Sequence, residues 1–256
     1  MPAPRKVLEG HNVGKTFGGA VALTSLDFHL VHGEVLGLIG PNGAGKTTLI
    51  NIVSGYLRAS SGTVTLRDRV ISSLPAHEIA RAGIARTFQT VRPFMGMTVE
   101  ENVLVGAFFG AARRTDDRHP RQRVDDALAF LSLTSRRDDP VNALTIADRK
   151  RVELARALAM EPQVLLLDEL MAGLNASEID QTIALVRDIN RLGVSLIIVE
   201  HVMEAVVGLC QRIIVLHHGQ KIADGPARMV LDDGRVIDAY LGSRYRDRVR
   251  GLEGKP

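Results

Sequence analysis

The sequence predicts an α/β fold organised around a parallel β-sheet, because three short apolar runs are of the kind that such a sheet buries on both faces. The runs are EVLGLIG, QVLLLDE and VSLIIVE, at residues 34–40, 163–169 and 194–200. Between the second and third runs, apolar residues recur at helical spacing, at Ile179, Ile183, Val186 and Ile189. This order of strand, helix and strand predicts a right-handed crossover between two parallel strands.

A glycine-rich loop and a short helix follow the first run. The loop is PNGAGKTT, and the apolar residues of LINIVSG predict a helix with Gly55 at its C-terminal cap. Antiparallel strands are expected at residues 20–31 and 62–70. The segment RIIVLHHGQKIADG is expected to form a hairpin that turns at Gly219 and Gln220.

The chain between the loop and LLLDE predicts an inserted subdomain. More than a hundred residues separate the two, which is too many for one crossover, and their pattern is mostly helical. We therefore expect a helical subdomain at about residues 90–160, within a single domain over residues 6–243. The α/β core with its antiparallel β subdomain would then occupy residues 6–89 and 161–243, and residues 244–256 form a basic tail.

Composition narrows the functional classes. The 256 residues carry a net charge of +3, and the basic runs at 113–123 and 243–251 are interrupted by acids or proline, which is typical of solvated segments. Aromatic residues make up 4% of the chain and tryptophan is absent, so no nucleic-acid partner is expected. The single cysteine, Cys210, lies in an apolar stretch and is expected to be a packing residue in a reducing compartment.

Apolar run length excludes a direct membrane span. A spanning helix needs about 18 consecutive apolar residues, and the chain has no such run. The N-terminus MPAPRKVLEG also lacks the apolar core of a signal peptide. Any role at a membrane is therefore expected to depend on partners.

The loop predicts a nucleotide site. Residues 40–47 match G-x-x-x-x-G-K-[ST] at every fixed position, between a predicted strand and a predicted helix. Glycines let successive backbone N–H groups curl round phosphates, and the helix N-terminus favours negative charge. Lys46 would place its charge between the β- and γ-phosphates, and Thr47 would offer its hydroxyl to Mg²⁺. The predicted nucleotide-binding residues are Gly40, Pro41, Asn42, Gly43, Ala44, Gly45, Lys46, Thr47 and Thr48.

An acidic pair supplies the second half of this site. Asp168 ends the predicted strand QVLLLDE, where its carboxylate could hold Mg²⁺. Glu169 directly follows it and could polarise an attacking water. The pair and the loop together predict that the chain binds and hydrolyses a nucleoside triphosphate.

Several segments resemble the ATP-binding subunits of ABC transporters, over about Val7 to Gly242. They are RTFQ, RKRVELARAL leading into LLLDE, AGLN at 172–175 and VEH at 199–201. The resemblance implies a P-loop NTPase with a RecA-like core, that is, the ABC ATPase fold with its β and helical subdomains. It also implies ATP and Mg²⁺ as cofactors, and two subunits that sandwich two ATPs head to tail.

The resemblance implies roles for three further residues. Gln89, in RTFQ, would lie near Mg²⁺ and the attacking water, as a metal-proximal and catalytic residue. His201 would contact the γ-phosphate and orient Glu169, and Phe17 would stack on the adenine ring. A core role for Phe17 and a structural role for His201 remain alternatives. The chain departs from the family pattern at Asn175, where an aspartate is usual.

A second departure lies at the predicted start of the RKRVELARAL helix. The family has a serine, two glycines and a glutamine here, which touch the ATP of the opposite subunit. This chain has Thr145 and Ala147, predicted to contact that nucleotide, followed by Asp148. An alanine hinders close backbone approach and a carboxylate repels phosphate, so a weakened contact and a heterodimer with unequal sites are expected, with a homodimer left open. The alternative is that Thr145 and Asp148 cap the helix.

Within the family, LIGPNGAGKTTLINIVSG and the ending VIDAYLG resemble the ATPases of branched-chain amino-acid importers. Urea or amide importers and lipopolysaccharide exporters share much of this pattern and remain alternatives, as does a soluble ABC-type switch. The resemblance implies permease subunits, a second ATPase subunit and, indirectly, a secreted substrate-binding protein as partners. It places the chain in the cytoplasm, on the inner face of the membrane. Phe94, Met95 and Met97 are predicted to form a groove for a permease helix, unless they pack in the helical subdomain.

Overall fold

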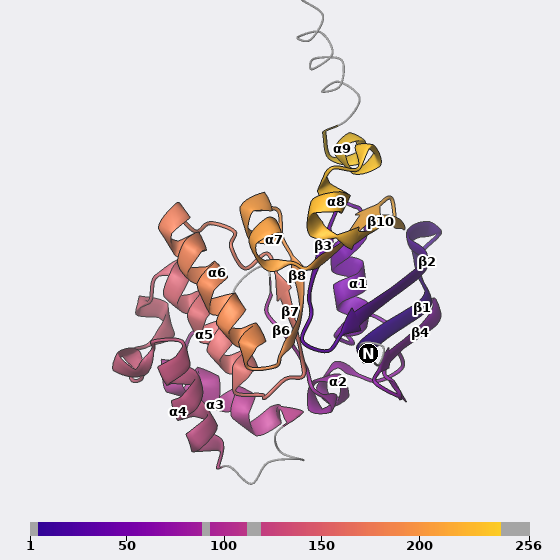
Figure 1. Ribbon diagram of the computed structural model, residues 1–256. Coiled ribbons are helices and arrows are strands. Elements are labelled where there is room, and N and C mark those ends of the chain that lie inside the picture. Colours follow the sequence, from indigo (N-terminus) through magenta and orange to yellow (C-terminus); the bar gives the residue numbers. More distant parts are fainter. Residues whose placement is uncertain (1–4, 89–92, 112–118, 242–256) are drawn as a thin grey trace, which may run out of the picture.

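The computed structural model describes residues 5–88, 93–111 and 119–241. A six-stranded sheet forms the centre of the molecule (Figure 1). In spatial order its strands are β10 (Gln220–Pro226), β9 (Arg212–His217), β3 (Val35–Ile39), β8 (Ser195–Val199), β7 (Val164–Asp168) and β6 (Ile84–Arg86). Neighbouring strands are parallel except β10, which pairs antiparallel with β9. The predicted α/β fold with a parallel sheet is confirmed.

Nine α-helices lie among the described residues. They are α1 (Lys46–Val53), α2 (Ala76–Ala82), α3 (Val99–Phe109), α4 (Pro120–Phe130), α5 (Ile146–Leu158), α6 (Ala176–Arg191), α7 (Met203–Leu209), α8 (Ala227–Leu231) and α9 (Gly234–Leu241). Local chemistry starts several of them: Thr98 with Glu101, and Asn175 with Glu178, form capping boxes at α3 and α6. None of these described helices is long and apolar enough to cross a bilayer.

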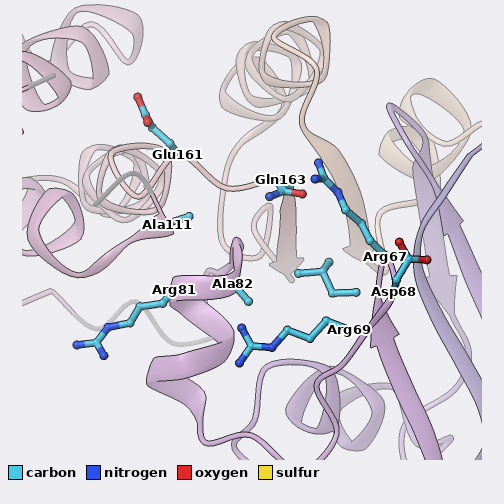
Figure 2. Close-up of a pocket in the computed structure, with 9 residues that line it drawn as sticks. Arg67, Asp68, Arg69, Arg81, Ala82, Ala111, Glu161 and Gln163 are labelled. Carbon is cyan, nitrogen blue, oxygen red and sulfur yellow. The ribbon is translucent and has the colours of Figure 1, made fainter. Parts of the chain in front are cut away.

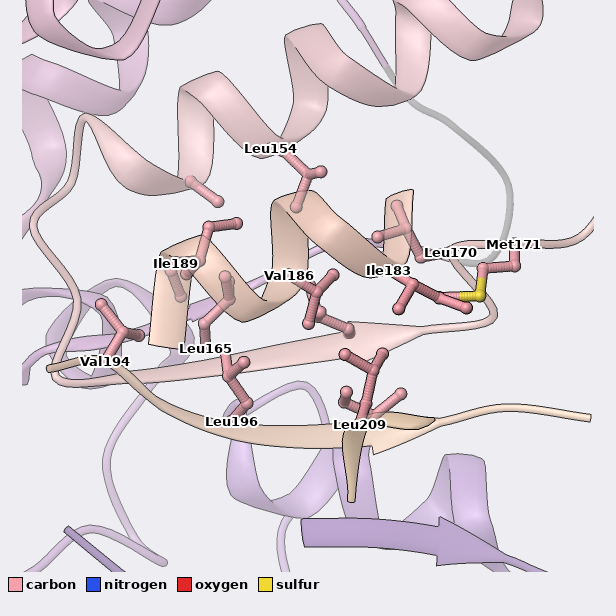
Figure 3. Packing of buried hydrophobic residues seen from close by; sticks show 14 of the residues in the cluster. Leu154, Leu165, Leu170, Met171, Ile183, Val186, Ile189, Val194, Leu196 and Leu209 are labelled. Carbon is pink, nitrogen blue, oxygen red and sulfur yellow. The ribbon is translucent and has the colours of Figure 1, made fainter. Parts of the chain in front are cut away.

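The sheet separates two hydrophobic cores, because successive residues of each buried strand point to opposite faces. On one face, Leu165 of β7 and Leu196 of β8 pack with Val186 of α6 (Figure 3). On the other face, Leu166 and Ile197 join the core that contains α1 and the antiparallel sheet. Burial of both faces explains why these strands read as continuous apolar runs.

A second, four-stranded sheet is antiparallel, as expected. Its order is β2 (Ala20–Val31), β1 (Lys6–Phe17), β4 (Ser61–Leu66) and β5 (Arg69–Val70). The single strand predicted at 62–70 is wrong, since the chain turns back between β4 and β5. Arg67, at this turn, has the left-handed value φ 54°, which a strand does not allow.

The C-terminal hairpin turns one residue earlier than predicted. The turn is His218–Gly219, with φ values of 46° and 75°, and Gln220 already pairs with His217. Positive φ at both central residues is the requirement of a type I′ turn, which fits the twist of the flanking strands. The prediction of Gly219 and Gln220 is therefore wrong by one position.

Helices α3, α4 and α5 pack together beside the central sheet (Figure 1). Val103, Leu128 and Val152, one from each helix, are fully or almost fully buried in the same core. This cluster is the inserted helical subdomain of the predicted fold. The limits proposed for the domain and its parts, at residues 6, 89, 161 and 243, stay predictions.

Candidate active site

The phosphate-binding loop joins β3 to α1, as predicted, and its glycines are required by its backbone. Gly40, Gly43 and Gly45 have φ values of 149°, 78° and 104°. A Cβ atom on Gly40 would lie 2.1 Å from the carbonyl oxygen of Leu216, at the end of the neighbouring strand β9. No side chain larger than hydrogen fits there, so the tight start of the loop depends on glycine.

Residues that are far from this loop in the sequence support it through hydrogen bonds. Gly219, in the C-terminal hairpin turn, donates its N–H to the carbonyl oxygen of Ala44 at 3.0 Å. Its own carbonyl oxygen accepts a hydrogen bond from the N–H of Thr24 in β2 at 2.9 Å. The loop is therefore positioned by both sheets as well as by its own helix.

Lys46 is a buried cation beneath the loop. Its Nζ donates hydrogen bonds to the carbonyl oxygens of Gly40 at 2.6 Å and Pro41 at 3.0 Å. Burial lowers the pKa of this ammonium group, and the negative charges of Glu169 and Asp168 act in the opposite direction. Both predicted carboxylates, Asp168 and Glu169, therefore lie close enough to the Lys46 ammonium group to raise its pKa.

A hollow of about 350 Å³ lies over the loop, and several of the groups that line it favour binding of an anion. Asn42 to Thr48 line it, together with Ala22 and Glu169. Gly45, the N-cap of α1, provides no side-chain hydrogen bond to the first turn of the helix. The backbone N–H groups of this first turn can therefore bind a ligand. The hollow thus combines an ammonium group, a helix N-terminus and the hydroxyls of Thr47 and Thr48.

Asp168 is buried at the end of β7 and is already paired with a cation. Its Oδ2 accepts a hydrogen bond from Arg86 Nη2 at 2.8 Å, and both side chains are over nine-tenths buried. Sequence reasoning missed Arg86. The only signal was its position three residues before Gln89, on the strand that runs next to QVLLLDE.

Glu169 and His201 form a pair at the edge of the hollow. The Nε2 atom of His201 lies 2.9 Å from Oε1 of Glu169, as expected if the histidine orients this carboxylate. Glu169 has φ 51°, in the left-handed region that is uncommon for a residue with a side chain. Its N–H donates to the carbonyl oxygen of Val199 at 2.8 Å, which locks this backbone conformation against β8.

Two buried charges hold the segment that follows Glu169, and sequence reasoning missed both. Lys150 of α5 donates from Nζ to the carbonyl oxygens of Leu170 and Ala172, each at 2.6 Å. Glu200 accepts the N–H of Met171 at 2.9 Å on the other side. Burial lowers the pKa of Lys150 and raises that of Glu200. The segment that follows Glu169 is therefore held from α5 and from the end of β8.

Three of the remaining predicted residues do not line the hollow: Phe17, Thr145 and Ala147. Phe17 ends β1, is 47% exposed and has the Nζ of Lys15 4.9 Å from its ring centroid. Thr145 and Ala147 lie at the start of α5 and do not line the hollow, whose lining comes from other elements. Gln89 lies outside the described residues, so its predicted metal and catalytic roles have no structural test.

The start of α5 confirms a helix cap. Thr145 is the N-cap residue, and its hydroxyl oxygen accepts the N–H of Asp148 at 3.1 Å. The same hydroxyl donates to Oδ2 of Asp148 at 3.0 Å. Arg136 and Arg151 lie 3.6 and 3.7 Å from the Asp148 carboxylate, so its negative charge is partly offset within the chain.

A second hollow, of about 730 Å³, is lined by the residues drawn in Figure 2. Gln163, which lines it, directly precedes β7, whereas Asp168 ends that strand. Five residues of strand span about 16 Å, so this hollow is remote from the phosphate loop. Arg67, in the turn after β4, and Arg69, the first residue of β5, reach toward it, whereas the side chain of Arg81, at its rim, points outward (Figure 2).

A phosphate loop and a carboxylate–histidine pair that follow parallel strands at the same edge of the sheet define the molecule as an ATPase of the α/β class. Residues 23–172 match the family model described as ABC transporter. The chain therefore belongs to the ABC transporter family, as an ATP-binding subunit.

Relatives and solved structures agree with this assignment. The chain is 37% identical over 241 residues to the branched-chain amino acid transport ATP-binding protein LivG of Salmonella typhimurium, covering 88% of this chain and 94% of LivG. It is 34% identical to the lipopolysaccharide export ATP-binding protein LptB of Acidithiobacillus ferridurans, covering 94% and 99%. The ADP conformation of an ABC transporter cassette superposes with a TM-score of 0.84 at 30% identity, covering 93% and 99%.

Proposed function

We propose that this chain is the ATPase subunit that energises import of branched-chain or other amino acids through ABC permeases. The observation that carries its ATP-hydrolysing part is the Glu169–His201 pair, with its 2.9 Å contact, at the hollow of the phosphate loop. The similarity to LivG and to BraF of Pseudomonas aeruginosa, 35% identical over 251 residues, supports amino acids as the transported class.

The residues present fit a magnesium nucleotide. In this proposal the loop N–H groups and Lys46 bind the phosphates, while Thr47, Asp168 and Gln89 contact Mg²⁺. A hydroxyl, a carboxylate and an amide are oxygen donors, which Mg²⁺ prefers, and this ion usually takes only one or two protein carboxylates. Among the described residues, no group of three or more acidic, histidine or cysteine side chains is placed so as to hold a metal. Bound magnesium would neutralise charge on the phosphates.

Glu169 and His201 would handle the water and its proton. The Glu169 carboxylate, 19% exposed and facing the hollow, would accept a hydrogen bond from the attacking water. His201 would hold that carboxylate through Nε2 and contact the terminal phosphate. The left-handed backbone of Glu169 aims the side chain, and its hydrogen bond to Val199 keeps this aim fixed. Phe17 would cover the adenine ring.

The chain would act in a dimer in which Thr145 and Ala147 approach the nucleotide of the partner subunit. The exposed start of α5 supports this placement, and Ala147 supports a weakened contact because its methyl group stands where the family pattern has glycine. We favour a heterodimer with one faster site, formed by the loop, Asp168 and Glu169 of this chain. The test is to place Glu169→Gln in one subunit at a time and measure turnover, since equal losses would contradict the asymmetry.

A permease helix would dock beside the helical subdomain. Phe94, Met95 and Met97 are 45%, 47% and 37% exposed, which supports a contact surface over core packing. Methionine adapts to irregular partners. The chain would thus lie in the cytoplasm at the inner membrane face. A crosslink from a cysteine at position 95 to the permease tests this, in a Cys210→Ser background, and a Val207→Cys variant at an exposed position is the control.

The similarity to LptB favours lipopolysaccharide export as the second candidate function. Co-purification from membranes with the permeases of neighbouring reading frames, followed by reconstitution, separates the two. Amino-acid import predicts that a loaded amino-acid-binding protein stimulates ATP hydrolysis, and that Glu169→Gln abolishes this stimulation. Stimulation by lipopolysaccharide alone would instead support export, and failure to purify with any permease would favour a soluble switch.

A further inference from the structure

Arg86 is a buried cation that joins the two halves of the candidate magnesium site. Its Nη2 donates to Oδ2 of Asp168 at 2.8 Å. Its Nη1 donates to Oδ1 of Asn51 at 2.5 Å and lies 3.2 Å from Oγ of Ser54. One guanidinium group therefore connects the end of β7 to the C-terminal part of α1.

The surroundings fix the guanidinium in place. Its Cζ atom lies 5.0 Å from the ring centroid of Phe88 and 5.8 Å from that of Tyr56. The two rings contact each other edge to face, with centroids 5.5 Å apart. Since 8% of the Arg86 side chain is exposed, the group cannot swing into water without opening this packing.

The arrangement relates Asp168 to Thr47. Thr47 and Asn51 are four residues apart on α1 and so lie on one face of the helix. By binding Asn51 and Asp168 together, Arg86 sets the distance between the helix face that carries the Thr47 hydroxyl and the carboxylate. Arg86 also ends β6, the strand that leads into Gln89, the third predicted magnesium contact.

We infer that Arg86 is a positioning residue for the magnesium site, holding Asp168 by Oδ2 so that Oδ1 is presented to the metal. The inference rests on the proposed metal role of Asp168. Within the described residues, Oδ1 of Asp168 has no hydrogen-bond partner, which leaves it available. Carboxylates that ligate metals are commonly held in this way by an outer hydrogen bond, and loss of such a partner costs about 10- to 100-fold in metal affinity.

The test measures metal affinity without turnover. The full chain is saturated with ADP, and Mn²⁺ binding is followed by the electron paramagnetic resonance signal of free Mn²⁺. Arg86→Met should weaken Mn²⁺ binding about 10- to 100-fold and leave ADP affinity in EDTA unchanged. Arg86→Lys, which keeps the charge but loses the planar fork, should fall between wild type and Arg86→Met. Unchanged or tighter Mn²⁺ binding in Arg86→Met would overturn the inference.

Three controls separate the possible failures. Asp168→Asn must weaken Mn²⁺ binding, and if it does not, the proposed metal role of Asp168 fails. If Asp168→Asn weakens Mn²⁺ binding but Arg86→Met does not, only the proposed role of Arg86 fails. Arg191→Met deletes an exposed arginine that is also 2.8 Å from an aspartate, and should change nothing. If Arg86→Met does not fold, Asn51→Ala decides, since it removes the shorter of the two contacts of Arg86 with α1 and its end and keeps the ion pair with Asp168. Asn51→Ala with unchanged Mn²⁺ affinity would then contradict the inference.

Discussion

Glu153 gives the sharpest prediction about stability, because it is an acid buried in the helical subdomain. It is 2% exposed on α5, and its Oε1 accepts the N–H of Phe88 at 2.9 Å. Burial raises the pKa of this carboxyl from 4.5 to about 7, against the Phe88 hydrogen bond and the nearby charges of Arg156, Lys150 and Arg86. The folded protein therefore binds this proton more tightly than the unfolded chain.

The sign and size of the effect follow from this difference. Stability from the protonated group is fully present below pH 4.5 and is lost as the pH rises through about 7. The pKa of Glu153 differs between the unfolded chain and the folded protein, at 4.5 and about 7. At about 1.4 kcal/mol per pKa unit, this difference corresponds to ~3 kcal/mol in the free energy of unfolding. Glu153→Gln keeps an oxygen for the N–H of Phe88 and stays neutral. The variant should therefore gain about 2 to 3 kcal/mol over wild type between pH 5 and pH 8, because a small part of the effect is already present at pH 5.

Urea unfolding followed by circular dichroism, at several pH values between 5 and 8, measures this difference. Wild type should lose stability relative to the variant as pH rises, and the gap should level off above pH 7. Glu204→Gln, which removes an exposed carboxylate on α7, controls for the change in net charge. A gap between Glu153→Gln and wild type that is the same at every pH, or a variant less stable at pH 8, would refute the reasoning.

Three further outcomes are expected. Gly40→Ala should abolish ADP binding and cost at least about 3 kcal/mol of stability, because its Cβ would lie 2.1 Å from the Leu216 carbonyl oxygen. ADP titration and thermal unfolding measure the two effects, and a stable variant that binds ADP would contradict the prediction. Thr145→Ala should cost about 1 kcal/mol in urea unfolding by removing the α5 cap, with ADP affinity unchanged; an effect on ADP affinity would show a further role in this chain's own site. Burial raises the pKa of Cys210 to about 12, so a thiol reagent at neutral pH should label the folded protein far more slowly than the urea-unfolded chain, and equal labelling rates would place the thiol at the surface.

Much of the fold could be predicted because its signals are local. Continuous apolar runs indicated β3, β7 and β8, since strands buried on both faces have no polar alternation. The meeting of Lys46 and Glu169 could also be predicted, because each follows a parallel strand and the carboxyl ends of such strands share one edge. The burial of Asp168 beside that edge has the same origin.

The errors and omissions concern features without a local signal. The strand expected at 62–70 is broken by the left-handed backbone of Arg67, a residue type with no preference for that conformation. The sequence alone does not distinguish three residues from ordinary charged positions of a strand or a helix, namely Arg86, Lys150 and Glu153. Their roles come from tertiary contacts with carbonyl, carboxylate and N–H groups 20 to 82 residues away along the chain, which no short motif encodes.

The hydrogen bond from Gly219 to Ala44 has a consequence for the order in which the molecule becomes competent during synthesis. The loop at 40–47 leaves the ribosome early, but its support from the hairpin turn is made some 175 residues later in the chain. A nascent chain arrested before residue 219 lacks this brace, and Gly40 has no β9 to lie against. The complete set of contacts that shapes the phosphate loop is therefore expected only after the C-terminal hairpin has been synthesised.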